Sequence, residues 1–247
     1  MYRYFIKSAV LLLLFSTIAI AQNQKETVKD TLVFKQKYGL RLGADIGKIV
    51  RSFVDDDYTG FEIVGDYRLS KKLYLAGELG NEERTLISES IDNTTKGSYF
   101  KAGVDINFYT NWLDMENMIY SGLRIGATTF SQTLNSYGVY NVNNQYWNEQ
   151  ITINPDTEFK GLTGLWTELQ IGLKAEIFNN FFAGVNVQLK FLVAEDQPGN
   201  YENLYLPGFG RTYDSSSFGA GFGYNLSYLI PIFKKDKIVI EEKEVEE

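Results

Sequence analysis

The side chains that carry most protein chemistry are missing from this sequence, which contains no cysteine and no histidine. Thiolate nucleophiles, disulfide frameworks and thiolate metal sites are therefore excluded. Histidine, the commonest general base and the commonest metal ligand, is absent too. The carboxylates of Glu82 and Glu83 could act as an acid/base pair, but adjacent strand residues point to opposite faces, so solvated loop charge is the favoured interpretation. We expect no catalytic residues, no enzyme and no cofactor.

The run Asp55-Asp56-Asp57 is the densest group of carboxylates. Hard cations bind several carboxylate oxygens, so the run could collect calcium or bridge cations to lipopolysaccharide phosphates. It lacks the spaced ligands and the glycine of a defined calcium loop, which favours a solvated acidic tip. We predict no metal site.

The first residues are typical of a secretory signal peptide. A short basic segment ending at Lys7 precedes an apolar run from Ser8 to Ile20, and Ala19-Ile20-Ala21 supplies a small-x-small cleavage site. We predict a signal peptide over 1–21 and a periplasmic segment over 22–37. Cleavage removes two of the 24 basic residues, leaving 22 against 31 acidic ones, a net charge of −9 that disfavours nucleic acid as a partner.

Composition and hydrophobic period indicate strands that alternate between an apolar and a polar environment. Aromatic residues make up 15% of the chain, with 22 glycines, and no later apolar run is long enough for a membrane helix. This suits a membrane barrel, whose strands show one residue to lipid and the next to the lumen. We predict an all-β fold, an eight-stranded antiparallel transmembrane β-barrel over 38–233, followed by a charged periplasmic tail over 234–247. The strands are expected at 38–46, 61–69, 73–80, 99–108, 119–127, 165–177, 182–193 and 218–230.

The predicted connections alternate in length. Short links at 70–72 and 178–181 and a medium one at 109–118 alternate with long links at 47–60, 81–98, 128–164 and 194–217. Outer-membrane barrels have short periplasmic turns and longer external loops, which a soluble sandwich does not require. Aromatic residues also cluster where strands should cross the two membrane interfaces, namely Tyr38, Tyr67, Phe108, Trp112, Phe178 and Tyr228 on the periplasmic side and Phe61, Phe100, Phe191 and Phe218 on the external side.

The same register directs charged residues of both signs into the lumen. An eight-stranded barrel is just wide enough for its side chains to fill it, so nearly balanced charges should pair into a network that plugs the interior. A conducting lumen is the alternative. The predicted lumen network comprises Arg41, Asp45, Glu62, Asp66, Arg68, Glu78, Lys101, Asp105, Arg124, Glu168, Lys174, Glu176 and Lys190, while Leu42, Val104 and Val187 should point outward.

Tyrosine and asparagine are concentrated in the third and fourth external loops. Such residues favour adaptable binding surfaces, because rings supply contact area and amides supply hydrogen bonds. Rings that pack the loops on one another are the alternative. The predicted external loop surface comprises Tyr137, Tyr140, Tyr146, Trp147, Tyr201, Tyr205 and Tyr213.

Several segments resemble a known family. The stretch from Tyr224 to Phe233 looks like the closing strand read by the barrel assembly machinery, although here the chain continues to Glu247. Tyr38-Gly39-Leu40-Arg41, Gly65-Asp66-Tyr67-Arg68, Asn111-Trp112-Leu113-Asp114 and the segment from Phe130 to Tyr137 resemble DUF6048, an uncharacterised family of small Gram-negative outer-membrane β-barrels. The resemblance implies a fold and a location. It says nothing about activity, because the family has none assigned.

Four hypotheses for function follow. The favoured one is a non-enzymatic outer-membrane barrel with a plugged lumen, whose external loops contact protein or glycan. A small pore or ligand carrier is the second. An outer-membrane hydrolase and a soluble lipocalin-like binder are the third and fourth. The expected partners are outer-membrane lipid, lipopolysaccharide and the barrel assembly machinery.

Overall fold

The computed structural model describes residues 27–88, 90–109, 116–139, 151–199, 201–213 and 215–244 of the 247. Two compact units are present. The larger, Lys35–Lys235, contains the ring of strands, and the smaller combines Met1–Phe34 with Asp236–Glu247. The predicted signal peptide lies outside the described residues.

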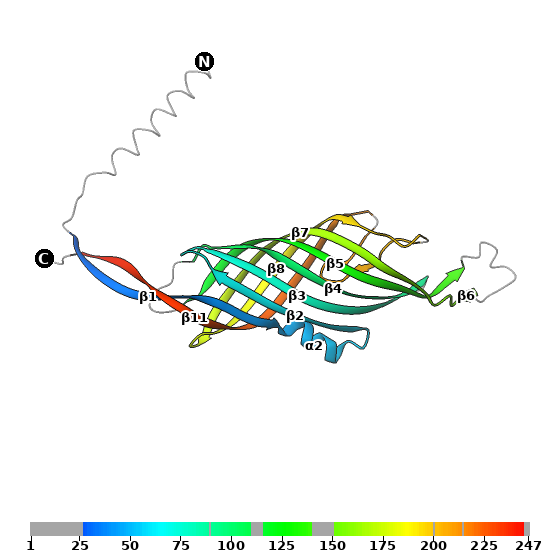
Figure 1. Ribbon diagram of the computed structural model, residues 1–247, viewed down its shortest axis with the longest axis horizontal. Helices are drawn as coiled ribbons and strands as arrows, with labels where there is room; N and C mark the ends of the chain where they lie inside the picture. The colour runs from blue at the N-terminus through cyan, green and yellow to red at the C-terminus, as the bar shows by residue number, and fades with distance from the viewer. Residues whose placement is uncertain are drawn as a thin grey trace, which may run out of the picture. The chain divides into compact units, whose positions relative to one another are not determined.

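The described residues form twelve strand or helix elements, all but one of them strands (Figure 1). The single helix among the described residues, α2, follows the first strand directly. It is not long and apolar enough to cross a membrane. In chain order the elements are β1 (Thr27–Asp45), α2 (Ile46–Val54), β2 (Tyr58–Arg68), β3 (Leu73–Ile87), β4 (Ile91–Asn107), β5 (Met118–Val139), β6 (Ile151–Ile153), β7 (Thr157–Phe178), β8 (Phe181–Glu195), β9 (Tyr205–Leu206), β10 (Gly210–Arg211) and β11 (Phe218–Glu244).

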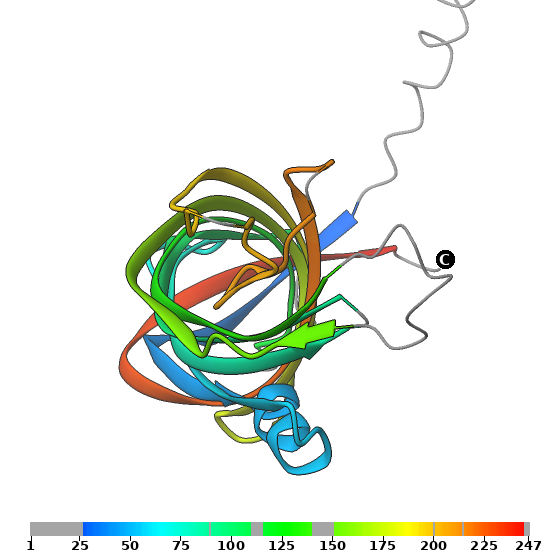
Figure 2. The ribbon, with the colours of Figure 1, turned by 90° about the vertical axis from the view of Figure 1, so that its right-hand side faces the viewer.

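Eight of these strands close into a ring. The order β4-β3-β2-β1-β11-β8-β7-β5 is completed by pairing of β4 with β5, and β6 pairs with the last residues of β5. Figure 2 shows this ring end on. The prediction of an all-β, antiparallel fold with eight strands in a ring is confirmed. The strands are uneven in length, from 11 residues in β2 to 27 in β11.

Alternation along the strands separates two faces, as expected for a closed sheet. In β5 almost every second side chain is buried in the ring and the next is exposed. The three residues predicted to point outward, Leu42, Val104 and Val187, are all exposed on the outer face. The inner face carries many charged residues, with smaller apolar clusters beside them.

The two ends of the ring differ. The links of residues 69–72 and 179–180 are short, as predicted, and define what we call the turn end. The opposite end, which carries α2 and the β9–β10 hairpin, is called the loop end. In Figure 2, α2 lies outside the ring, whereas the orange β9–β10 segment lies within its outline.

The prediction of a long link over 81–98 was wrong. β3 continues to Ile87 and β4 starts at Ile91, so the link is a tight hairpin. Polar cross-strand pairs extend these strands, with Thr85 bonded to Thr94 at 3.0 Å and Asn81 to Ser98 at 2.9 Å. Because neither face there is apolar, the hydrophobic period that marks strands was hidden.

Most of the aromatic residues predicted for the two belts are exposed. Every residue predicted for the loop end is exposed on the outer face, as are Phe108, Phe178 and Tyr228 at the turn end. Trp112 lies outside the described residues. Tyr38 was misplaced: it is buried and stacks on Phe233 with 5.2 Å between ring centroids. Tyr38 and Arg41 are both buried although they are three positions apart, a spacing that should put them on opposite faces, so the alternation does not hold from Tyr38 onward.

Candidate functional site

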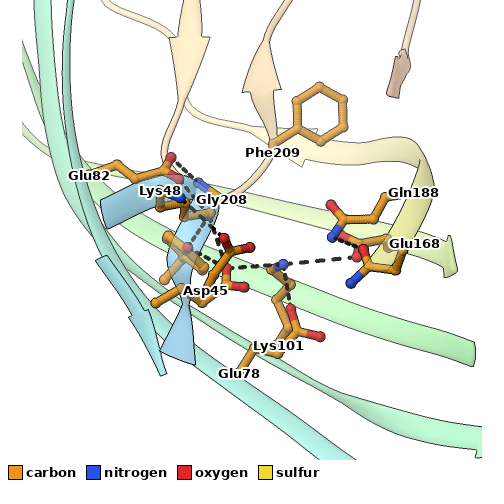
Figure 3. Close-up of polar contacts among 12 residues, drawn as sticks. Asp45, Lys48, Glu78, Glu82, Lys101, Glu168, Gln188, Gly208 and Phe209 are labelled. Carbon is orange, nitrogen blue, oxygen red and sulfur yellow. Dashed lines mark hydrogen bonds and ion pairs between the residues drawn. The ribbon is translucent and has the colours of Figure 1, made fainter. Parts of the chain in front are cut away.

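The interior charges converge on two hubs, and Glu82 is the hub at the loop end. Its carboxylate accepts hydrogen bonds from Lys48 at 2.6 Å, the Tyr58 hydroxyl at 3.1 Å, the Tyr205 hydroxyl at 2.8 Å and the Gly208 amide at 2.9 Å. Figure 3 shows Glu82 and Lys48 beside Gly208, with Lys101 linking Glu78 toward Glu168. One carboxylate therefore ties together α2, β2, β3 and the β9–β10 hairpin.

From Glu82 a chain of alternating charges runs through the ring. Lys48 bridges Glu82 and Glu62, at 2.6 and 2.9 Å, and Lys101 bridges Glu62 and Glu78, at 3.3 and 2.5 Å. Each cation thus lies between two carboxylates. Such pairing offsets the desolvation that burial imposes on isolated charges.

The chain continues from Glu78 toward the turn end. Arg124 contacts Glu78 at 3.5 Å and Asp105 at 2.6 Å, and Lys174 contacts Asp105 at 3.9 Å and Asp66 at 2.7 Å. These contacts are ion pairs across β3, β4, β5, β7 and β2, so they connect strands on opposite sides of the ring.

Asp66 is the second hub. Arg41 reaches it through Nε, at 3.0 and 3.1 Å from the two carboxylate oxygens, and through Nη2 at 2.9 Å. Lys174 approaches the same carboxylate. The Cα register pairs Arg41 with Asp66, which confirms the prediction that Arg41 lies closer to Asp66 than to Glu62. The guanidinium also stacks over the Phe182 ring at 4.6 Å.

A separate cluster closes the turn end. Arg68 pairs with Glu116 at 2.7 Å, and Lys37 pairs with Glu176 at 3.5 Å. The Glu116 carboxylate also accepts the backbone amide of Lys37 at 3.1 Å. Arg68 and Glu176 therefore belong to this cluster and not to the chain of charges between Arg41 and Glu82.

The structure places all the predicted lumen residues on the inner face, where each is buried except Glu176, which is half-buried. Asp45 does not join the ion-pair chain; its carboxylate caps α2 by accepting the Lys48 amide at 3.1 Å. Glu168 and Lys190 join only loosely, 3.9 Å apart. The Glu168 carboxylate instead accepts a hydrogen bond from the side-chain amide of Gln170 at 2.5 Å.

Sequence reasoning missed Lys48, Glu82 and Glu116. The sequence carried a signal for Glu82, which has the same parity as the predicted lumen residue Glu78 on one uninterrupted strand. It was interpreted as a solvated loop charge because β3 was ended too early. Glu83, on the opposite face, does fit that interpretation: it pairs with Lys96 at 3.1 Å and both side chains are largely exposed. Lys48 and Glu116 lie outside strands, where parity carries no information.

The residues predicted for the external loop surface divide into groups. Tyr137 lies on β5 and is exposed, as is Tyr213, over whose ring the Arg211 guanidinium lies at 5.6 Å. Tyr201 is half-buried and contacts Phe159 edge on at 5.9 Å. The prediction for Tyr205 was wrong, because it is buried and hydrogen-bonded to Glu82. Tyr140, Tyr146 and Trp147 lie outside the described residues.

Tyr205 is buried because its hairpin folds into the ring. Leu206 and Phe209 pack against Trp166, Tyr99 and Phe130 in a cluster at the loop end. Phe209 meets Trp166 edge on at 6.1 Å. The fourth external loop is therefore partly an internal plug, which supports the alternative that its rings pack on the protein itself.

Asp55, in the acidic run, forms ion pairs with arginine. It lies 2.5 Å from Arg84 and 3.1 Å from Arg51. Desolvation raises the pKa of Asp55, but hydrogen bonds from Arg84 and Arg51 outweigh it, so the pKa lies below its ordinary value of 3.8. Among the described residues, no three acidic side chains are grouped so that they could hold a metal ion.

The fold and site together define a closed antiparallel ring with an apolar exterior and an ion-paired interior. The chain belongs to the family described as Domain of unknown function (DUF6048), which matches residues 1–235. Among solved structures, the attachment invasion locus protein Ail of Yersinia pestis is similar over 81% of this chain and 96% of that chain, at 11% identity and a TM-score of 0.35. No curated protein matches the sequence.

Proposed function

We propose that this protein is an integral outer-membrane β-barrel of a Gram-negative cell with a closed lumen and no enzymatic activity. Its outward side chains carry the proposal. Large apolar residues are exposed around the whole ring, including Leu79, Ile125, Ile171 and Val187 on four different strands. A water-soluble protein rarely exposes a continuous apolar surface of this extent, whereas a bilayer requires one.

The ion-paired interior supports a closed lumen. Two interior cavities between Glu62 and the turn end have volumes of only about 20 and 10 Å³, the first beside Asp66 and Glu78 and the second beside Arg41 and Arg68. A cavity of this size holds about one water molecule. An ion that crossed the ring would have to displace side chains held by two partners each, so conduction is disfavoured.

The loop end is the surface available for recognition. Tyr137 and Tyr213 are exposed there, and the orientation with short turns in the periplasm would direct them outside the cell. We propose a contact with protein or glycan at this end, with outer-membrane lipid and lipopolysaccharide around the wall. The barrel assembly machinery would insert the chain through the part of β11 that reaches Phe233.

Two measurements test the proposal. Membranes of expressing cells are washed with alkaline carbonate and with urea; the protein should stay in the outer-membrane fraction and enter solution only with detergent. Release by either wash would contradict membrane insertion and favour a soluble binder. The purified barrel is then reconstituted in planar bilayers, where steady conductance steps would contradict the closed lumen and favour a pore.

A further inference from the structure

The wall of the ring is interrupted at the loop end of the seam between β1 and β11. β1 ends at Asp45, and the last pair that it forms with β2 joins Ala44 to Ile63. Gly43 lies against Leu226, and Gly47 lies against the Tyr224 ring, so β1 ends level with residues 224–226 of β11. β11 nevertheless runs on to Phe218 along β8, and β2 runs on to Tyr58 along β3. Two neighbours of β1 therefore extend beyond it.

A cavity of about 330 Å³ occupies this gap. Phe222 and Tyr224 line it from the outer face of β11, where Phe222 is 70% exposed. Glu82 and Lys190 line it from the lumen, where Lys190 is 6% exposed. Residues of both faces of the sheet share one cavity, so it passes through the wall and connects the exterior with the loop-end hub.

The cavity is lined by more cations than anions. Asp45 and Glu82 are its only carboxylates among the described residues, and the cations are Lys48, Arg51, Arg84, Lys190 and Arg211. Two of the cations have no carboxylate at hydrogen-bond distance. Lys190 donates to the carbonyls of Gly208 and Phe209, at 2.8 and 3.1 Å, and Arg211 forms no ion pair with any described residue. A cation-rich pocket of this kind favours an anion with several acceptor oxygens.

An apolar groove leads from the cavity down the outside of the ring. The groove has a volume of about 430 Å³, is lined mainly by Ile119, Ile171, Leu173, Val185 and Val187, and shares Phe222 and Tyr224 with the cavity. The two shared rings meet edge on at 5.8 Å. A cationic pocket and an apolar groove that share a wall match an amphiphile with an anionic head and a hydrocarbon chain.

We propose that the β1–β11 seam binds a phosphate-bearing lipid of the surrounding bilayer, with the phosphate among Lys190, Arg211 and Arg84 and the chain in the groove. The site rests on the proposed membrane location, since the groove faces lipid only in a bilayer. The other occupant of such a pocket, free inorganic phosphate, would use the cations and leave the groove empty. Binding of the lipid should therefore depend on both the cations and the groove, whereas binding of inorganic phosphate should depend on the cations alone.

The experiment is native mass spectrometry of the full chain in a nonionic detergent, with added dioleoyl phosphatidic acid, dioleoyl phosphatidylcholine or inorganic phosphate. We expect one phosphatidic acid to be retained, about tenfold more tightly than phosphatidylcholine, because a phosphate monoester accepts more charge-assisted hydrogen bonds. Inorganic phosphate at the same concentration should not displace it. Equal retention of the two lipids, or displacement by inorganic phosphate, would overturn the proposal.

Two variants with matched controls test the two halves of the site. Arg211→Gln should weaken retention about tenfold, and Lys71→Gln, which removes an exposed charge at the turn end, should not. Phe222→Ala should also weaken retention, whereas Leu123→Ala, which truncates an exposed wall residue outside the groove, should not. Arg211 and Phe222 are exposed, so these variants should fold. If the variants and their controls lost retention of phosphatidic acid equally, the lipid would bind the wall without preference for the seam, and the proposed site would be wrong.

A label on Ile125→Cys keeps this failure separate from failure of the proposed membrane location. The chain has no other cysteine, and Ile125 is exposed on the wall away from the seam. In liposomes, quenching of the label by brominated lipid chains reports lipid contact. Quenching without specific retention of phosphatidic acid would overturn the seam site alone, and absence of quenching would overturn the membrane location as well.

Discussion

Replacement of Asp66 by alanine is the most direct test of the interior network. The Asp66 carboxylate receives hydrogen bonds from Arg41 Nε and Nη2 and from Lys174 Nζ, all within 3.1 Å of an oxygen. Its loss leaves two buried cations, and only Lys174 retains another carboxylate, Asp105 at 3.9 Å. Breaking a buried pair by removing one partner costs about 3 to 5 kcal/mol. With a urea dependence of about 2 kcal/mol per molar, the unfolding midpoint should fall by roughly 1.5 to 2.5 M.

The assay is urea unfolding of the detergent-folded barrel, followed by far-ultraviolet circular dichroism and by heat-modifiable migration in gels. Asp66→Ala combined with Arg41→Met should recover part of the loss, because one of the unpaired charges is removed as well. Glu83→Ala is the control: the exposed Glu83–Lys96 pair should contribute about 0 to 1 kcal/mol. A double variant that unfolds at no higher urea than Asp66→Ala would show that Arg41 and Asp66 are not coupled, and would refute the network argument.

Three further predictions follow from the wall, the helix and the acidic run. Leu42→Arg should destabilise the barrel by about 2 to 4 kcal/mol in lipid vesicles if the residue lies near the bilayer midplane, and wild-type urea unfolding would contradict a lipid-facing position. Phe53 is 83% exposed on α2, so an environment-sensitive fluorophore on Phe53→Cys should shift to the blue in liposomes, while one on Asp57→Cys in the exposed link should not. Two equal spectra would place the helix in water. The folded-state pKa of Asp55 is lowered, so its ion pairs stabilise the loop end above pH 3.8 and are lost as pH falls through that lowered pKa. Arg84→Gln should raise the pKa of Asp55 toward 3.8, and an unchanged titration by nuclear magnetic resonance would rule out control by Arg84.

The ring and most of its interior could be predicted from the sequence because period-two alternation fixes which face a charge occupies. Arg41 and Asp66 illustrate this, since antiparallel pairing of adjacent strands also fixes which charges lie side by side. The lengths of the strands were harder to predict from the sequence. β3 and β4 continue through polar residues such as Asn81 and Thr94, where backbone pairing persists without an apolar face.

The loop end could not be predicted because its geometry depends on contacts that are remote in sequence. Tyr205 and Glu82 are 123 residues apart, and nothing in the local sequence of the fourth loop indicates that it turns inward. The amide of Gly208 also reaches the Glu82 carboxylate, at 2.9 Å, within the same hub. A tyrosine in a loop rich in tyrosine and asparagine fits an exposed contact surface equally well. A buried loop differs from an exposed one here because another strand, β3, supplies the Glu82 carboxylate as a buried acceptor for Tyr205.

The difference between the two ends of the ring can be traced to Asp45. An aspartate is favoured at the N-cap, directly before the first residue of a helix, because its carboxylate accepts a hydrogen bond from a backbone amide, here that of Lys48. This contact ends β1 while β2 and β11 continue, which leaves the gap in the seam. The helix that begins there turns Lys48 inward to Glu82 and leaves Phe53 outward. One local capping preference thus accounts for the start of the helix, for its exposed apolar face and for the gap in which the cavity lies.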